Sequence, residues 1–246
     1  MKSFDKLYIG GAFVSPAGTG TVDVRSPATG ERVGRVPEAT NADIDRAVAA
    51  AREAFDRGPW PRMSPAERAD ALGRLNEQLM MREEELANVI TAEVGSPITF
   101  SHAAQTTAAS MVLQYYTDLA RTFAFDEVRD GILGKAHVLR EPLGVAGAII
   151  PWNVPLFVAI TKVAPALAAG CTVVLKPPPE TPLFAYLLAD AIEAAGIPKG
   201  VINIVAAGRF PFRDLVTHTF KLEEIEAAYE LFAHQRDGVM KVAIRP

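Results

Sequence analysis

The chain has 246 residues, 49% hydrophobic and 22% charged, which is typical of a globular protein with one large or two ordinary domains. Its 25 basic and 29 acidic residues argue against a nucleic-acid ligand, because phosphate-backbone binding needs a clustered basic surface. One cysteine excludes an intramolecular disulfide framework and fits a reducing cytoplasm, where we expect the chain.

Neither a secretory signal nor a membrane span is expected. The first residues contain no apolar run like the core of an export signal. The longest apolar region, 156–175, is interrupted by Lys162, Pro165 and Gly170. It therefore predicts a buried helix followed by a buried strand rather than a membrane helix.

The first sixty residues predict strands and then a helix. Short strands and turns over residues 8–14, 21–24 and 32–36 indicate an edge hairpin. Thr40 can cap the helix that follows, which Gly58 and Pro59 end. The apolar face expected for this helix consists of Ile44, Ala47, Val48, Ala51 and Phe55.

Helices and an arm are expected next. Ser64, Pro65 and Glu67 form a capping signature that indicates a helical hairpin, and 82–94 continues as helix to Gly95. The acidic first turn of that helix, Glu83 to Glu85, predicts a solvated helix end. Residues 99–122 predict one long helix, and 123–125 with 135–140 predict an antiparallel arm, which needs a partner surface because two strands alone are marginally stable.

Between Gly144 and Val205 the pattern alternates strand, helix, strand, helix and strand. The expected elements are 145–150, 157–169, 172–175, 183–195 and 201–205. Such alternation specifies right-handed crossovers and a parallel sheet covered by helices. We therefore predict an α/β fold with an incomplete Rossmann-like parallel sheet, flanking helices, an N-terminal β-hairpin and an antiparallel arm.

The candidate binding site lies after two of these strands. Open parallel sheets bind ligands outside the carboxyl ends of their strands. Pro151, Trp152 and Asn153 follow one strand, and Lys176 ends the next, so both segments should line one crevice. Lys176 could hold a ribose hydroxyl or a phosphate, and the alternative is a solvated lysine at a strand end.

Several motifs resemble those of aldehyde dehydrogenases. They are 23–31, 93–97, 151–153 and 169–177, in that order and at that spacing. The resemblance covers residues 8–209 and implies NAD or NADP as cofactor. It assigns to Asn153 the amide that donates to the oxyanion of the thiohemiacetal. Lys176 matches the lysine that holds the adenosine ribose, and residues 123–140 match the arm used in subunit pairing. The residues that match the floor of the dinucleotide cleft are Ile149, Ile150, Pro151 and Trp152.

The sequence also departs from that family. Many members have a glutamate three residues after the lysine, where this chain has Pro179 followed by Glu180, so NAD versus NADP stays open. The Gly-Ser-Thr loop, the Glu-Leu-Gly-Gly segment with the general base and the catalytic cysteine of the family have no counterpart in this chain. Cys171, the only cysteine, fits a buried packing residue. The four histidines lie apart, so no metal site is expected.

The last residues, 210–246, resemble the C-terminal end of medium-chain zinc-type alcohol dehydrogenases, without their metal-binding cysteines. Residues 222–232 predict a helix there and 239–244 a strand. We therefore expect a dinucleotide-binding domain over 1–122 and 143–209, an arm for oligomerisation over 123–142, and a helix-strand tail over 210–246.

Three functional hypotheses stay open. The chain is a truncated or hybrid aldehyde dehydrogenase that lacks its nucleophile, or an inactive dinucleotide-binding or assembly protein that pairs with itself or with a full-length homologue. The third is that another polypeptide supplies the missing half, so that an aldehyde becomes a substrate only in the complex. Whether the chain by itself is an enzyme is left open by the sequence.

Overall fold

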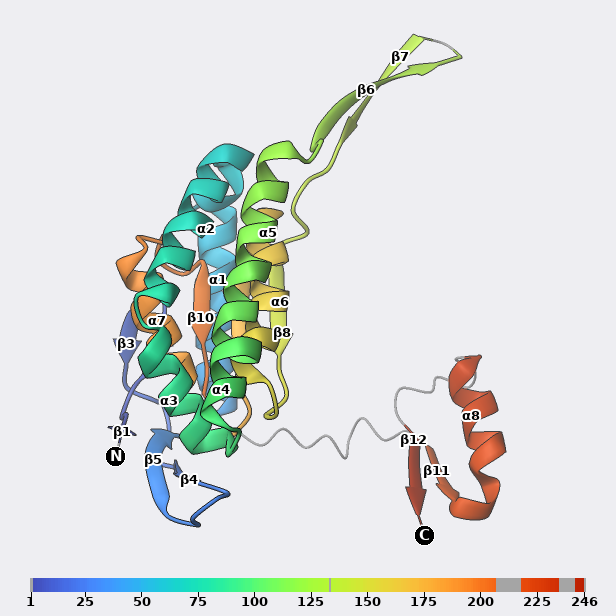
Figure 1. Cartoon of the computed structure of the whole chain (residues 1–246). Helices are drawn as coiled ribbons and strands as arrows, with labels where there is room; N and C mark the ends of the chain where they lie inside the picture. Colours follow the sequence, from blue (N-terminus) through green and yellow to red (C-terminus); the bar gives the residue numbers. More distant parts are fainter. Residues whose placement is uncertain (1, 133, 207–217, 235–241, 246) are drawn as a thin grey trace. The chain divides into compact units, whose positions relative to one another are not determined.

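The computed structural model describes residues 2–132, 134–206, 218–234 and 242–245. The chain divides into two units, Met1–Gly208 and Arg209–Pro246, whose elements are labelled in Figure 1. The junction predicted at Arg209 and Phe210 lies outside the described residues.

The larger unit is built around a five-stranded sheet in the order β3-β2-β10-β9-β8. Its strands are β2 (Leu7–Ile9), β3 (Ala12–Val14), β8 (Val145–Ile149), β9 (Thr172–Lys176) and β10 (Ile202–Ile204). β8, β9 and β10 run parallel, whereas β2 pairs antiparallel with β10 and with β3. Every residue of β9 is buried, as in a central parallel strand covered on both faces. The predicted parallel sheet is confirmed.

A smaller sheet has the order β1-β5-β4. It consists of β1 (Lys2–Ser3), β4 (Thr21–Arg25) and β5 (Arg32–Pro37). β4 and β5 pair antiparallel, so the expected hairpin is present at residues 21–37. Residues 8–14 form a second, tighter hairpin, because Gly10 and Gly11 take φ values of 66° and 77° that favour glycine.

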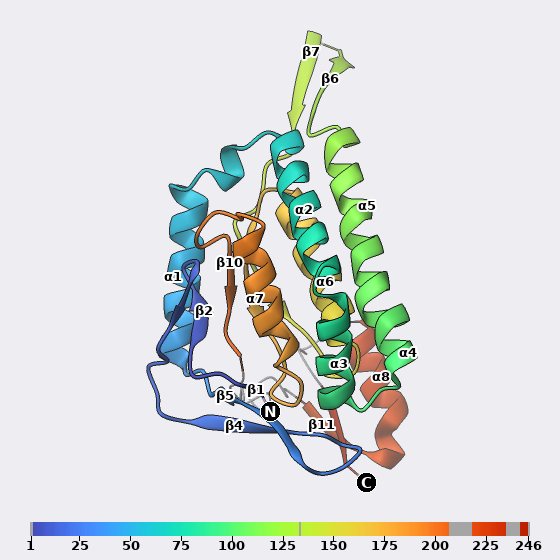
Figure 2. The same ribbon diagram turned by 60° about the vertical axis from the view of Figure 1, so that its left-hand side comes forward.

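Helices cover both faces of the large sheet. The helical segments of this unit include α1 (Asn41–Asp56), η1 (Trp60–Arg62), α2 (Pro65–Met80), α3 (Glu83–Val94), α6 (Pro155–Ala168) and α7 (Phe184–Ala194). α1 lies on one side of the strands, and α6 and α7 lie on the other, as Figure 2 shows. α2 packs outside α6 and α7 and forms a further layer.

The predicted helix starts are confirmed by their caps. The backbone N–H of Thr40 donates to the carboxylate of Asp43 at 2.9 Å, and Ser64 accepts from the backbone N–H of Glu67 at 3.2 Å. The face expected for α1 was partly wrong, because Val48 is 43% exposed whereas Asp43 is buried. Asp43 is buried because it also accepts from the backbone N–H of Ala17, which ties the helix start to the N-terminal strands.

The long helix expected over residues 99–122 is interrupted in the structure. It consists of α4 (Ile98–Phe100), a π-helical segment η2 (Ser101–Thr107) and α5 (Ala108–Thr122). Beyond it, β6 (Asp126–Gly131) and β7 (Gly134–Leu139) pair antiparallel and project from the body of the unit (Figure 1). Their side chains are mostly exposed, so the arm has little apolar contact of its own.

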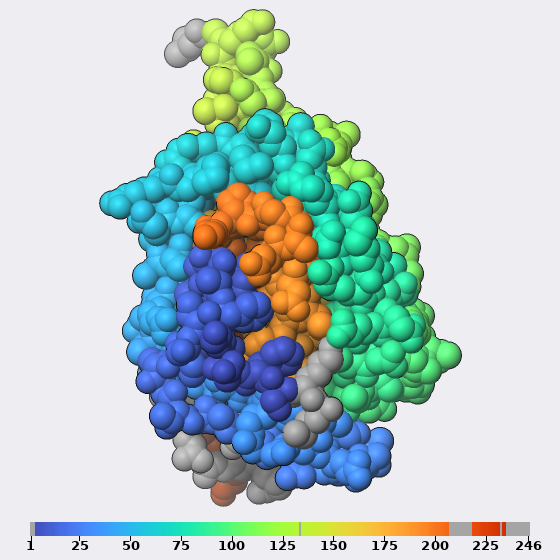
Figure 3. Space-filling model, turned by 90° about the vertical axis from the view of Figure 1, so that its left-hand side faces the viewer, coloured from blue at the N-terminus to red at the C-terminus, as the bar shows by residue number. Residues whose placement is uncertain are grey.

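The start of the chain packs beside its later part. In Figure 3 the N-terminal strands, in blue, lie next to the α7 region, in orange. The rings of Phe4 and Tyr186 stack with centroids 3.9 Å apart, and Phe13 stacks on Tyr186 from 6.3 Å. These aromatic contacts fix the N-terminal hairpin against α7.

The smaller unit contains a strand, a helix and a second strand. Its elements are β11 (His218–Lys221), η4 (Leu222–Glu224), α8 (Ile225–Ala233) and β12 (Val242–Arg245). β11 and β12 run parallel, so this is a β-α-β unit with one more strand than the sequence predicted. In neither unit does a helix of the described residues have the length and apolar character needed to cross a bilayer.

Candidate functional site

The two candidate segments meet at the carboxyl ends of β8 and β9. The backbone N–H of Ile150 donates to the carbonyl of Lys176 at 3.3 Å, so the turn after β8 lies directly beside the end of β9. The strand ends are neighbours because β8 and β9 are adjacent and parallel. The structure therefore brings the 151–153 turn and Lys176 to one edge of the sheet.

The turn exposes most of its side chains. Trp152 is 55% and Ile149 56% exposed, and Pro151 and Asn153 are exposed as well. Ile150 is only 5% exposed, so its side chain belongs to the core and it can contribute to a cleft through its backbone alone. The exposed set offers an indole face, an aliphatic side chain and one amide, which suits a ligand with a ring and polar groups.

Lys176 ends β9 in a largely buried position. It is 7% exposed, and this burial lowers its pKa, while the nearby Glu180 carboxylate acts in the opposite direction. Glu180 is exposed and Pro179 is half-buried. A partly desolvated ammonium group next to an open edge favours a ligand rich in hydroxyl or phosphate oxygens, so these residues fit the ribose part of a dinucleotide.

Two buried side chains from other segments hold the 151–153 turn. The hydroxyl of Thr181, which is 1% exposed, donates to the carbonyl of Trp152 at 3.2 Å. The amide Nε2 of Gln105, which is fully buried in the π-helical segment η2, lies 3.5 Å from the carbonyl of Asn153. Sequence reasoning missed both residues, because their partners lie 48 and 29 residues away in the chain.

Glu93 anchors the loop that follows β9. It lies at the end of α3, is 3% exposed, and accepts from the backbone N–H groups of Leu183 at 2.7 Å and Phe184 at 3.2 Å. These donors open α7, so Glu93 caps that helix from 90 residues away in the chain. Burial raises the pKa of Glu93 to about 8, and the two backbone N–H groups oppose this shift. Its motif was quoted for the family resemblance, but its capping role was not foreseen.

Cys171 lies at the opposite end of β9 from Lys176. It precedes β9, whereas Lys176 ends β9, and its side chain is half-buried. Five strand residues span about 16 Å at a rise of about 3.3 Å per residue. The thiol is therefore far from Asn153, and an oxyanion formed by its attack would lie out of reach of that amide.

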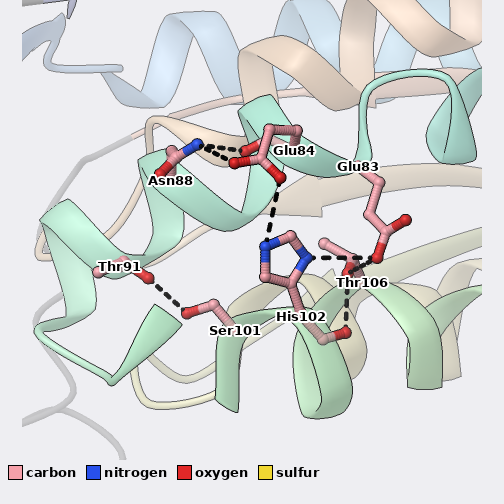
Figure 4. Close-up of polar contacts among 7 residues, drawn as sticks. All are labelled: Glu83, Glu84, Asn88, Thr91, Ser101, His102 and Thr106. Carbon is pink, nitrogen blue, oxygen red and sulfur yellow. Dashed lines mark hydrogen bonds and ion pairs between the residues drawn. The ribbon is translucent and has the colours of Figure 1, made fainter. Parts of the chain in front are cut away.

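The acidic turn of α3 exposes Glu84 and Glu85, as expected of a solvated helix end, and it also contacts the π-helical segment. Figure 4 shows the His102 ring between two carboxylates, with Nδ1 3.4 Å from Glu83 and Nε2 3.4 Å from Glu84. Thr106 also donates to Glu83, at 3.2 Å, so this turn of α3 is fastened to the π-helical segment. The described residues contain no group of three His, Cys, Asp or Glu side chains able to hold a metal ion.

Comparisons with known proteins identify relatives of this chain. The model of the aldehyde dehydrogenase family matches residues 13–221. Geranial dehydrogenase of Castellaniella defragrans is 40% identical over 213 residues, which are 86% of this chain and 45% of that protein. A putative aldehyde dehydrogenase of Bacillus subtilis is 42% identical over 200 residues, 81% of this chain and 40% of its own length.

Solved structures give the same result. The aldehyde dehydrogenase of Mycobacterium tuberculosis, in complex with NAD+, superposes with a TM-score of 0.83 at 39% identity, covering 99% of this chain and 51% of that one. The chain thus spans about half the length of the relatives it matches, or somewhat less. With a family match over most of its residues, the chain belongs to the aldehyde dehydrogenase family.

Proposed function

We propose that this chain is the dinucleotide-binding part of an NAD(P)-dependent aldehyde dehydrogenase, an oxidoreductase that converts an aldehyde to a carboxylic acid. The observation that carries the proposal is the contact of the 151–153 turn with the end of β9 through Ile150 and Lys176. It joins an exposed indole and amide to a largely buried lysine at the edge where parallel sheets bind ligands. The NAD+ complex of the M. tuberculosis relative supports the same assignment.

Three parts of the site would hold the dinucleotide. Lys176 would donate to the adenosine ribose, and the exposed faces of Ile149 and Trp152 would pack against the ligand. Pro151 keeps the turn short and stiff, so that its backbone can approach the ligand closely. The bound nicotinamide supplies the acceptor for the hydride that the aldehyde carbon loses.

Asn153 would stabilise the developing oxyanion. Its side-chain amide can donate to the carbonyl oxygen of the aldehyde once a thiolate attacks the carbonyl carbon. A donor already fixed in place contributes about 2.7–4 kcal/mol to such a transition state. The turn that carries Asn153 is tied down by Thr181 and Gln105, which supports a fixed direction for this amide.

The nucleophile is the part that this chain does not offer. Cys171 lies at the amino end of β9, about 16 Å from the candidate site along the strand. We therefore propose a truncated or hybrid chain without the catalytic cysteine and the general-base glutamate. Aldehyde oxidation would then need a second polypeptide that supplies both groups.

NAD is the cofactor that the loop after β9 favours. Pro179 has no side-chain acceptor for the ribose hydroxyls, but the carboxylate of Glu180 lies close enough to Lys176 to affect its pKa. A carboxylate there accepts from a ribose hydroxyl and repels a 2′-phosphate. NADP stays the alternative, because Glu180 is one residue further along than the glutamate of many relatives.

An assembly function is the second candidate. In the arm 123–142, Val128 is 61% exposed, Ile132 fully exposed and Leu139 56% exposed. A two-stranded arm with apolar side chains in water is marginally stable by itself, which supports pairing with a second copy or with a full-length homologue. We propose the arm as a part separate from a dinucleotide-binding domain over 1–122 and 143–209, with a cytoplasmic location.

The tail over 210–246 is proposed to derive from the end of an alcohol dehydrogenase. The support is its order of elements, a helix α8 followed by a strand β12, which is the order at the end of those enzymes. The sequence of the tail contains none of the metal-binding cysteines of those enzymes.

Titration with NADH tests the proposed function. Trp152 lies at the site and Trp60 is fully buried, so energy transfer from tryptophan to NADH would report binding. Lys176→Met should weaken binding about tenfold to a hundredfold, because it removes a charge-assisted hydrogen bond. Lys162→Met, at an exposed lysine of α6, is the matched control and should bind like the wild type.

Three outcomes would contradict parts of the proposal. If neither NADH nor NADPH binds at millimolar concentration, the dinucleotide function is wrong and the assembly function remains. If the pure chain reduces NAD+ with an aldehyde, and Cys171→Ala is as active as the wild type, a group other than Cys171 is the nucleophile. The inference that this chain lacks a nucleophile is then wrong. If Cys171→Ala abolishes that activity, Cys171 is the nucleophile, and the inference that it lies too far from Asn153 to react is wrong.

A further inference from the structure

Gln105 occupies an unusual position for a polar side chain. It is 0% exposed, although other residues of the same helical segment, Ala103 and Thr107, are exposed. Its Nε2 reaches the carbonyl of Asn153 at 3.5 Å, across 48 residues of sequence. Its Oε1 has no hydrogen-bond partner among the residues that the structure describes.

Packing alone does not account for this residue. A buried carbonyl oxygen without a partner costs about 1–3 kcal/mol, so an apolar side chain of the same size would serve the core better. Residues that cost stability in this way are expected at functional sites. The buried amide therefore points to a task at the turn that it contacts.

The backbone around Gln105 has a second unusual feature. Ser101–Thr107 is π-helical, a form that is rare and occurs often at functional sites. Within it the consecutive residues Gln105 and Thr106 are both buried. Thr106 faces Glu83 of α3 while Gln105 faces Asn153, so the widened turn lets neighbouring residues serve two different partners.

We propose that Gln105 is a positioning residue for Asn153. By donating to the Asn153 carbonyl, Gln105 fixes the plane of the peptide that follows Asn153. It thereby fixes the direction of the Asn153 side-chain amide that would meet the oxyanion. Thr181 fixes the preceding peptide through the Trp152 carbonyl, so two consecutive carbonyls are held by side chains from two different segments. The proposal deepens the function proposed above and rests on the role of Asn153 in it.

Nuclear magnetic resonance on the full chain tests the proposal. Gln105→Met keeps the size of the side chain and removes both polar atoms. We expect the backbone order parameter of Asn153 to fall from a rigid value near ~0.85 to below ~0.6. The urea midpoint of unfolding should stay the same or rise, since an unpaired buried oxygen is removed. Gln114→Met is the matched control, because Gln114 is an exposed glutamine of α5 bonded to Asp118 at 3.0 Å.

Gln105→Glu provides a rescue that a purely structural role would not produce. Burial keeps the new carboxyl group protonated to a higher pH, and its O–H can then donate to the Asn153 carbonyl. The order parameter of Asn153 should be near the wild-type value at low pH and should fall when the carboxyl group ionises. This test also decides the matter if Gln105→Met does not fold.

Each result has a defined meaning. An unchanged Asn153 order parameter in Gln105→Met, or an equal loss in Gln114→Met, would overturn the proposal. Failure of both Gln105 variants to fold would also overturn it, because Gln105 would then be required for folding of the chain. Because the measurement uses the chain without a ligand, a wild type that binds no dinucleotide would count against the proposed function and not against the positioning role.

Discussion

Replacing Glu93 by glutamine should remove a large pH-dependent contribution to the stability of this protein. The carboxyl group is 3% exposed, and its pKa is raised from 4.5 to about 8 by burial. Glutamine keeps the size and can accept a hydrogen bond from the start of α7, but it does not titrate. The wild type and Glu93→Gln therefore differ mainly in the one proton that the Glu93 carboxyl group can bind or release.

The magnitude follows from linkage between protonation and folding. Below about pH 4.5 the carboxyl group is protonated in both the folded and the unfolded chain, and its contribution to stability is fully present. As the pH rises to about 8, the unfolded chain loses the proton while the folded chain keeps it, so the free energy of unfolding falls. At about 1.4 kcal/mol per pH unit, this loss is on the order of 5 kcal/mol.

Urea unfolding at several pH values between 5 and 8.5 measures the effect. Emission of Trp60, which is fully buried, reports the unfolding of the core. The wild-type free energy minus that of Glu93→Gln should decrease steadily as the pH rises, because all other titrating groups are common to both proteins. Glu67→Gln is the control without a slope: the hydrogen bonds from Ser64 lower the pKa of Glu67, so its carboxyl group is ionised in both the folded and the unfolded chain over this range, and the difference from wild type should be constant.

One result would refute this reasoning. If the difference between wild type and Glu93→Gln is constant or increases with pH, the backbone donors of Leu183 and Phe184 and the positive end of α7 outweigh burial. Glu93 would then be an ionised cap in the folded protein, with a pKa that is not raised above its usual value.

Two further substitutions test the packing around the N-terminal hairpin. Gly11→Ala places a Cβ 2.7 Å from the Lys199 side chain at a φ of 77° and should destabilise the protein by more than Gly30→Ala. The Cβ of Gly30→Ala meets nothing within 4 Å, so this control bears only the backbone strain of about 1–2 kcal/mol. The difference between the urea midpoints of the two variants measures the clash, and equal midpoints would refute it. Asn203→Leu removes the fully buried side-chain oxygen that accepts from the Gly10 N–H at 2.8 Å, and it should lower the free energy of unfolding by about 1–3 kcal/mol. Hydrogen exchange of the Gly10 amide should become much faster, and unchanged exchange would contradict the contact.

Local signals predicted the framework of the larger unit. Val, Ile and Leu runs of strand length, separated by helix-length segments and bounded by glycine and proline, specified β8, β9 and β10 as parallel strands. Ser64 started α2 as predicted, because a capping box involves residues only three positions apart. In these elements the deciding interactions lie within a few residues of sequence.

The parts that were not predicted depend on contacts between distant segments. Val48 has the spacing of a core residue but is 43% exposed, whereas Asp43 is buried and accepts a hydrogen bond from the Ala17 amide. The π-helical segment arises where Gln105 and Thr106 face partners on different elements. No periodicity of the sequence could reveal those partners.

The candidate site divides in the same way. Its edge followed from the rule that parallel sheets bind ligands at their carboxyl ends, and the turn at 151–153 lies beside Lys176 as expected. Its support did not follow, because Glu93 and Gln105 are contributed by helices that precede the β-α-β part by about 40 residues or more. A polar residue in the middle of a helix gives no sign of the carbonyl it will meet.

This origin of the support has a consequence for the site. Asn153 lies in the turn after β8 and Lys176 at the end of β9, and each of the segments that follow these strands is held by a residue from an earlier helical segment. Glu93 of α3 holds the loop after β9, and Gln105 of η2 holds the turn after β8. These two anchors belong to one packed pair, since α3 is fastened to η2 through Thr106 and His102. A change that separates α3 from η2 would therefore loosen both loops together while leaving the parallel strands paired, so the order of the cleft should depend on helical contacts that are remote from any ligand.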